Sequence, residues 1–308
     1  LEFRRVLFRS NTWFFVDQQY GVMPLLYRDM VTALSNTYSG WILWNLFLAL
    51  IPLLLSFRLF RPQALSPLWF RIICGVVGLV GLPGIWSRLP WFAQNWIALI
   101  LEVFTGDGRA LLRLGWLVLA VGFALALGRS GLGSRQGSRA WGWGVGVGVF
   151  IAFLPNAPYL LTDIIHLVRG LSSGQVASWV AILIFVPMHM TAILVGFEAY
   201  VLSILNLAYY LKRHGARAWI LPTELLIHAF CALGIYLGRF MRLNSWDLVT
   251  APLDVLINTL NLLSSKRPLL VVIVTFLILA GLYWLMKQIT LGLKLRLDYA
   301  RQGLEALD

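Results

Sequence analysis

Charged residues are scarce in this chain, since only 12% of its 308 residues are Asp, Glu, Lys or Arg. A soluble domain carries about 25%, so these charges are too few to coat a soluble globule. Hydrophobic residues make up 59% of the sequence, and the mean hydropathy is +0.79. Together these values exclude a soluble enzyme, a disordered chain and a nucleic-acid-binding domain, despite the net charge of +12. They indicate a polytopic membrane protein whose expected partners are membrane lipids rather than nucleic acid.

Cysteine is also rare. Cys74 and Cys231 are the two cysteines, both lie in apolar segments, and they form no Cys-x-x-Cys motif. This spacing argues against a secreted disulfide scaffold and against a cysteine-based metal site. The sequence has no Walker loop and no His-x-x-His pair. We therefore expect no metal and no cofactor.

The chain divides into four parts by composition. Residues 1–10 resemble a translated sequencing adapter, so we expect them to be non-native. Residues 11–40 form an N-terminal extracytoplasmic segment whose true start is uncertain. A single transmembrane domain is expected over residues 41–287, followed by a basic cytoplasmic tail at 288–308.

Apolar segments of membrane-spanning length recur along the sequence. A bilayer core about 30 Å thick needs roughly 20 apolar residues per helix. The run Trp91–Phe104, bounded by Pro90 and Gly106, is shorter and predicts an interfacial or re-entrant segment. The fold class expected is therefore an all-α bundle of about seven transmembrane helices. The seven segments are Trp41–Phe57, Leu68–Trp86, Leu111–Leu127, Ala140–Leu154, Val176–Leu211, Trp219–Phe240 and Pro268–Met286.

Two of these spans contain further structural signals. Val176–Leu211 is too long for one perpendicular crossing, so it should tilt or project, with a kink favoured at Pro187. Small residues let helices approach closely in lipid, and the second span has a glycine at every third position. These four glycines, Gly75, Gly78, Gly81 and Gly84, predict a smooth packing ridge.

Basic residues predict the orientation of the bundle, because cytoplasmic loops carry an excess of Lys and Arg. With seven spans, every basic cluster falls on one side of the membrane if Trp91–Phe104 does not cross. The N-terminus is then outside and the C-terminus is in the cytoplasm. The clusters are Arg58, Arg61 and Arg71; Arg129, Arg135 and Arg139; Lys212, Arg213 and Arg217; and Lys287, Lys294, Arg296 and Arg301.

Polar residues follow the fourth span in the segment Pro155–His166. Its candidate site residues are Asn156, Tyr159, Asp163 and His166. In a helix, Asp163 and His166 would share a face at spacing i and i+3. That pair suits a carboxylate that orients an imidazole, or half of a metal site. Because zinc takes three or four protein ligands, an interfacial turn with a hydrogen-bonded pair is favoured.

A second polar segment follows the sixth span. Its candidate residues are Arg239, Arg242, Asn244 and Asp247. The predicted topology places this segment and Pro155–His166 on the same outer face. The two arginines could clamp a carboxylate or a phosphate. Alternatively, they pair with Asp163 or Asp247 and extend to the membrane interface.

A polar stripe runs along the sixth span. Glu224 and His228 lie at i and i+4, and Glu198 and His189 on the fifth span are expected neighbours. Ionisable groups in a membrane are costly and usually face the bundle interior or a water-filled cavity. A protonated Glu198 that hydrogen-bonds to a helix is an equally valid interpretation. The full stripe comprises Glu224, His228, Cys231, Ile235, Arg239 and Arg242.

The sequence contains a set of distinctive motifs, which are Trp41–Ala49, Pro155–Tyr159 with Thr162 and Asp163, Gly234–Phe240, and Asn244–Asp247. These motifs resemble domain of unknown function family 1361. The resemblance spans roughly Trp41 to Met286 and implies a multi-pass protein of a bacterial cytoplasmic membrane, but it implies no mechanism. The family pattern has Trp where this chain has Leu243, so a stacking role at that position is doubtful.

Three functions are compatible with these patterns. A transporter or channel-like protein would use the stripe on the sixth span as an ion or proton path, with a polar site at the extracytoplasmic face. A membrane-embedded enzyme acting on a lipid-linked or outer-leaflet substrate would gather the outer residues in one pocket. A structural or assembly protein would use the same motifs only to close helix ends. Transport is favoured over the other two, and no catalytic residue is assigned.

Overall fold

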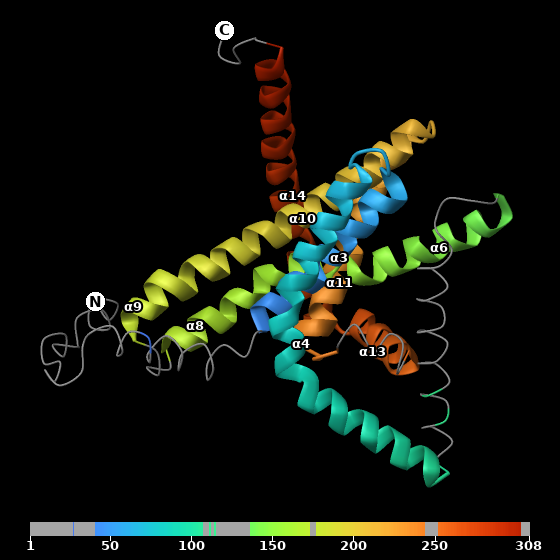
Figure 1. The fold of residues 1–308 in the computed structure, drawn as a ribbon. Coiled ribbons are helices and arrows are strands. Elements are labelled where there is room, and N and C mark those ends of the chain that lie inside the picture. Colours follow the sequence, from blue (N-terminus) through green and yellow to red (C-terminus); the bar gives the residue numbers. More distant parts are fainter. Residues whose placement is uncertain are drawn as a thin grey trace, which may run out of the picture. The chain divides into compact units, whose positions relative to one another are not determined.

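The computed structural model describes residues 27, 41–106, 111, 114, 136–172, 177–243 and 252–302 (Figure 1). Regular structure in these residues is helical throughout, and they contain no strand. In lipid, every backbone N–H and C=O must be satisfied within the segment, which an α-helix achieves. The expectation of an all-α polytopic membrane protein is therefore confirmed.

Six described helical segments are long and apolar enough to cross a membrane. Five of them contain or closely match a span expected from the sequence, whereas Gly142–Arg169 extends well beyond the expected Ala140–Leu154. Almost all of Leu111–Leu127 lies outside the described residues. The orientation of the bundle stays a prediction. The six segments are Trp41–Phe60, Pro67–Ile85, Gly142–Arg169, Ser178–Arg213, Arg217–Arg239 and Lys266–Arg301.

The chain divides into two compact units. One contains residues 1–39 and 165–188, and the other contains residues 40–164 and 189–308. The smaller unit contains α9 (Ser178–Val180) and all of α8 (Ile164–Ser172) except its first residue. A π-helical turn, η4 (Ala181–Phe185), then precedes α10 (Val186–Arg213). This irregular turn lies directly before Pro187, whose missing N–H and ring disturb the preceding hydrogen bonds.

In the larger unit, α3 (Trp41–Phe60) is the common neighbour of several elements. It packs against α4 (Pro67–Phe104), α6 (Gln136–Phe153), α7 (Asn156–Tyr159) and η3 (Leu160–Asp163). A Cβ at Gly84 would lie 2.5 Å from Trp44 Cβ, and one at Gly81 would lie 2.8 Å from the Phe47 ring. Of the four glycines predicted to form a packing ridge, Gly81 and Gly84 therefore lie against α3. Nothing lies within 4 Å of a Cβ built at Gly75 or Gly78.

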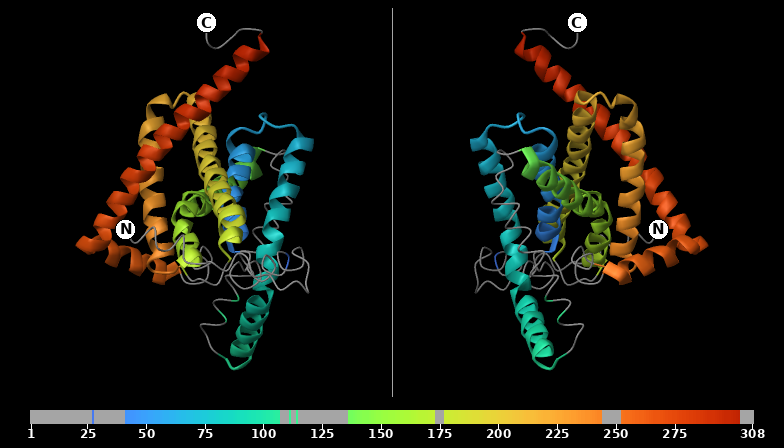
Figure 2. Two further views of the ribbon diagram at one scale, coloured as in Figure 1. Left: turned by 90° about the vertical axis from the view of Figure 1, so that its left-hand side faces the viewer. Right: turned by 90° about the vertical axis from the view of Figure 1, so that its right-hand side faces the viewer.

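Helix α4 passes through Pro90, where the sequence analysis expected a boundary. It bends along its length (Figures 1 and 2), as helices with an internal proline do. The expected boundary at Gly106 is present. Gly106 follows the helix with φ 81°, a left-handed conformation that suits glycine at a helix C-terminus.

The C-terminal half of the larger unit is built on a helix pair. Helix α11 (Ile220–Arg239) follows the short turn η5 (Arg217–Trp219) and packs along α14 (Lys266–Arg301) (Figure 2). Helix α13 (Pro252–Ser264) also contacts α14. At 36 residues, α14 is about 54 Å long at 1.5 Å per residue, so it extends beyond a bilayer core of about 30 Å.

Candidate functional site

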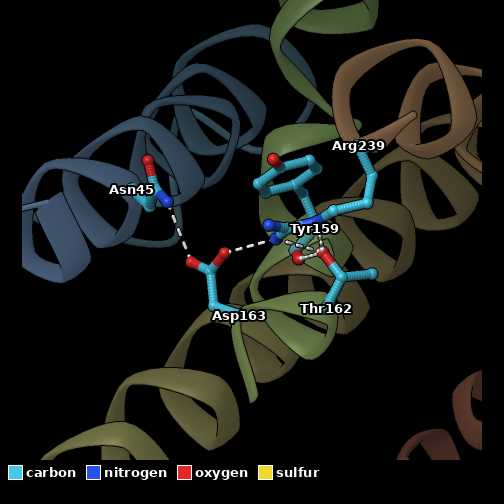
Figure 3. Close-up of polar contacts among 5 residues, drawn as sticks. All are labelled: Asn45, Tyr159, Thr162, Asp163 and Arg239. Carbon is cyan, nitrogen blue, oxygen red and sulfur yellow. Dashed lines mark hydrogen bonds and ion pairs between the residues drawn. The ribbon is translucent and has the colours of Figure 1, made fainter. Parts of the chain in front are cut away.

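Asp163 and Arg239 form an ion pair between the end of η3 and the end of α11 (Figure 3). Arg239 Nη2 lies 2.5 Å from Asp163 Oδ1. The Asp163 side chain is fully buried, and that of Arg239 is 15% exposed. A pair this well removed from solvent is stable only when its remaining hydrogen-bonding groups also have partners.

Those partners are present. Asn45 Nδ2 on α3 donates a hydrogen bond of 2.8 Å to Asp163 Oδ2, so both carboxylate oxygens are engaged (Figure 3). The Arg239 guanidinium donates from Nε and Nη2 to Thr162 Oγ1 over 3.0 and 2.6 Å. It also lies over the Tyr159 ring, with Cζ 4.5 Å from the ring centroid. We call these five residues the outer cluster.

Local sequence explains how the outer cluster is assembled. Pro155 ends the preceding helix, and Asn156 Nδ2 donates to a backbone carbonyl three residues earlier. Two short helical turns, α7 and η3, then direct Asp163 toward the interior. On α11, glycines leave room for this segment. A Cβ at Gly234 would lie 2.8 Å from Pro155 Cβ, and one at Gly238 would lie 3.1 Å from the Tyr159 ring.

The structure brings together only some of the outer residues that the sequence nominated. Arg242 follows the end of α11 with φ 58°, is exposed, and belongs to no described ion pair. His166 belongs to the smaller unit. Asn244 and Asp247 lie outside the described residues. Tyr159, Asp163 and Arg239 are thus the predicted residues that meet.

Two members of the outer cluster, Asn45 and Thr162, were not nominated as site residues. Asn45 interrupts the otherwise apolar run Trp41–Ala49, and a polar side chain in such a run needs a partner. That interruption was the available signal. Thr162 carries no comparable signal, because a hydroxyl beside an interfacial turn is common and usually bonds locally.

A second set of polar side chains lies between α11 and α14. Lys287 Nζ is 2.6 Å from Glu224 Oε1, and the Tyr283 hydroxyl donates to the same oxygen over 2.7 Å. The Glu224 and Lys287 side chains are 8% and 23% exposed. A carboxylate and an ammonium thus neutralise each other within two helices that are long and apolar enough to span a membrane.

This set continues toward α10 through rings and hydroxyls. The Tyr283 and His228 ring centroids are 4.7 Å apart. The Tyr200 hydroxyl lies 2.6 Å from His228 Nδ1, and Cys231 follows His228 by three positions, on the same face of α11. All four side chains are buried. Together with Glu224 and Lys287 they form what we call the inner cluster. Glu224, His228 and Cys231 were expected to share a stripe, and the structure turns that stripe inward.

The two nominated residues of α10 lie apart from each other. His189 is fully buried, with its ring centroid 5.6 Å from that of Trp41. Glu198 is half-buried, and the Thr290 hydroxyl on α14 lies 2.9 and 3.1 Å from its two oxygens. Within the described part of the chain, no group of three or more His, Cys, Asp or Glu side chains is placed to hold a metal ion.

A family model described as "Protein of unknown function (DUF1361)" matches residues 111–280. The chain belongs to this family. No curated protein and no solved structure matches it. The DUF1361 match, together with the apolar helices, supports an integral membrane protein.

The DUF1361 segment contains part of each cluster. It includes Asp163 and Arg239 of the outer cluster, and Glu224 and His228 of the inner one. Partners of these residues lie outside the matched segment, on α3 and on the C-terminal part of α14. They are Asn45, Tyr283 and Lys287.

Proposed function

We propose that this DUF1361 protein is a transporter or channel-like protein that moves protons along the inward face of α11. The observation that carries the proposal is the inner cluster, in which Glu224 and His228 are buried and Lys287 is half-buried within membrane-length helices. Ionisable groups at such positions are costly, and they commonly mark ion and proton paths. Apolar residues of similar volume would hold two helices together without this cost.

The chemistry of the inner cluster suits proton movement. Phenol hydroxyls and neutral imidazoles both donate and accept hydrogen bonds, so they can relay a proton between neighbouring groups. One hydrogen-bonded group contains Lys287, Glu224 and Tyr283, and another contains His228 and Tyr200. Ring contacts join the two groups, because Tyr283 lies 4.7 Å from His228 and 6.2 Å from Tyr200 between ring centroids. A proton therefore passes between them when water or a ring rotation links them.

The outer cluster would close the other end of this path. Buried Ile235 lies between Cys231 and Arg239 on the same face of α11, so apolar contact separates the two clusters. The Asp163–Arg239 pair then covers the helix end. In this proposal the structure represents a closed state, and passage to the extracytoplasmic side requires the pair to separate.

A flux assay on the purified full-length chain tests the proposal. The protein is reconstituted into liposomes that contain a pH-sensitive dye, and a potassium diffusion potential drives proton entry. We expect the wild type to acidify the lumen and E224Q to abolish the flux while remaining folded. D298N is the control, because Asp298 is a 45% exposed carboxylate on α14, the helix that carries Lys287. Wild-type vesicles without flux, or E224Q vesicles with full flux, would overturn the proposal.

A structural or assembly role is the second candidate, and the outer cluster favours it. Asp163 and Arg239 engage each other directly, and among the described residues no buried side-chain N or O atom lacks a hydrogen-bond partner. In this case E224Q would impair folding or assembly, and the wild type would carry no flux. The enzyme alternative has less support, because Asp163 and Arg239 neutralise each other rather than standing free for a substrate.

We also propose that the protein resides in a bacterial cytoplasmic membrane with its C-terminus in the cytoplasm. The support is the distribution of Lys and Arg between the apolar spans. Fusions of alkaline phosphatase and green fluorescent protein to the C-terminus test this orientation. Fluorescence without phosphatase activity is expected, and the reverse pattern would contradict it.

A further inference from the structure

Glu198 lies near the middle of the membrane-spanning part of α10. The position of Glu198 along the span can be judged from two ring contacts between α10 and the ends of α3. These ends are Trp41 and Phe60, the first and last residues of that 20-residue helix. Trp41 packs against His189, with ring centroids 5.6 Å apart, and Phe60 packs against Tyr210, with centroids 5.7 Å apart. Glu198 falls nine residues after His189 and twelve before Tyr210. Its carboxyl group is thus far from both ends of the span.

In the part of the chain that the structure describes, the carboxyl group of Glu198 has one side-chain partner, which is a hydroxyl. Thr290 Oγ1 lies 2.9 Å from Oε1 and 3.1 Å from Oε2. Among the described residues, no Lys, Arg or His nitrogen lies within 4.0 Å of it. Glu224 differs in this respect, because Lys287 lies 2.6 Å from its carboxylate. An ionised carboxylate at this depth without a cation carries a large desolvation cost.

Charged groups on the neighbouring helices do not remove this cost. Lys287 and Lys294 share the face of α14 that presents Thr290, but Lys287 is occupied by Glu224 and Lys294 is exposed without a described ion pair. On α11, Glu224 is neutralised, and His228 Nδ1 is bonded to the Tyr200 hydroxyl.

Thr290 is placed to accommodate two protonation states. Its Oγ1 also lies 2.9 Å from the Met286 carbonyl oxygen. A hydroxyl has one proton to donate and can also accept. If Glu198 is ionised, the Thr290 proton points to the carboxylate. If Glu198 is protonated, it donates to Thr290 Oγ1, and Thr290 donates to the Met286 carbonyl.

We infer that Glu198 and Thr290 form a proton-binding site in the middle of the membrane, separate from the inner cluster. The site holds its proton on the Glu198 carboxyl and releases it when the carboxyl group reaches water. The inference does not depend on the proposed transport activity, because its test measures occupancy rather than flux.

Carbodiimide labelling tests the inference. N,N′-dicyclohexylcarbodiimide reacts with protonated carboxyl groups in apolar surroundings, and mass spectrometry of peptides from the full-length membrane protein locates the adduct. We expect labelling of Glu198 that decreases as the pH rises, with Glu224 unlabelled because Lys287 pairs with its carboxylate. In T290V the labelling should persist to higher pH, since the ionised carboxylate loses its donor.

Other outcomes decide against the site. Protection by sodium at constant pH would show that an alkali ion is the ligand and would overturn the proton assignment. Labelling in K294M but not in the wild type would show that Lys294 neutralises Glu198. If no label is found at any pH, infrared spectroscopy provides the second measurement. The absence there of a carboxylic acid band that E198Q removes would overturn the inference, and its presence would support it.

Discussion

The Tyr200 hydroxyl on α10 lies 2.6 Å from His228 Nδ1 on α11, and both side chains are at most 2% exposed. Replacing Tyr200 with Phe keeps the ring but leaves a buried imidazole nitrogen without this partner. Loss of one partner from a buried pair costs about 1–3 kcal/mol. We expect Y200F to lower the free energy of unfolding in detergent by that amount. Y209F is the control, because Tyr209 is 41% exposed and its ring contact with Arg61 needs no hydroxyl. Equal effects of the two variants would contradict this prediction.

The outer ion pair predicts a non-additive effect. R239M leaves the fully buried Asp163 carboxylate without its cation, which typically costs about 3–5 kcal/mol. The double variant D163N/R239M removes both charges, so it should be more stable than R239M alone. Unfolding curves of the wild type, both single variants and the double variant measure the coupling. If the double variant loses as much free energy of unfolding as the two single variants together, the two residues are not coupled.

Close packing of α3 on α4 predicts opposite outcomes for two glycines of one helix. An alanine methyl at Gly84 would lie 2.5 Å from Trp44 Cβ and 3.0 Å from Trp44 Cα, so the backbone must shift. G84A should destabilise the protein by about 1–3 kcal/mol, the usual range for overpacking. G75A meets nothing within 4 Å and should be neutral or slightly stabilising. Thermal unfolding in detergent compares them, and similar midpoints would contradict the observed packing.

A hydrogen bond between uncharged side chains of α3 and α10 should contribute less to stability than the Asp163–Arg239 ion pair. Asn206 Nδ2 donates to Ser56 Oγ over 3.0 Å, and both residues are buried. Interhelical hydrogen bonds in membrane proteins contribute about 0.6 kcal/mol on average and rarely exceed about 2 kcal/mol. We expect S56A to destabilise within that range, and S264A, at an exposed serine with a local bond, to have no measurable effect. A loss for S56A as large as that for R239M would contradict this ranking.

The sequence alone determined the fold class and most of the spans. In lipid, a run of roughly 17–20 mainly apolar residues satisfies its own backbone as a helix, so Trp41–Phe57 and Pro268–Met286 were recognisable from local composition. The inward stripe of Glu224, His228 and Cys231 was also predictable, because helical spacing places these residues on one face. Pro90 was misleading, since a helix can bend at a proline and continue, as α4 does.

Only the tertiary structure decided which polar groups meet. The residues of the outer pair are 76 positions apart, and Asn45 is 118 positions from Asp163. Lys287 and Thr290 were assigned to the end of the last span or to the tail, yet they bind Glu224 and Glu198. Helical periodicity determines which side of one helix is polar. The partner across the interface depends on how helices cross and where glycines permit close approach, and no local pattern encodes that geometry.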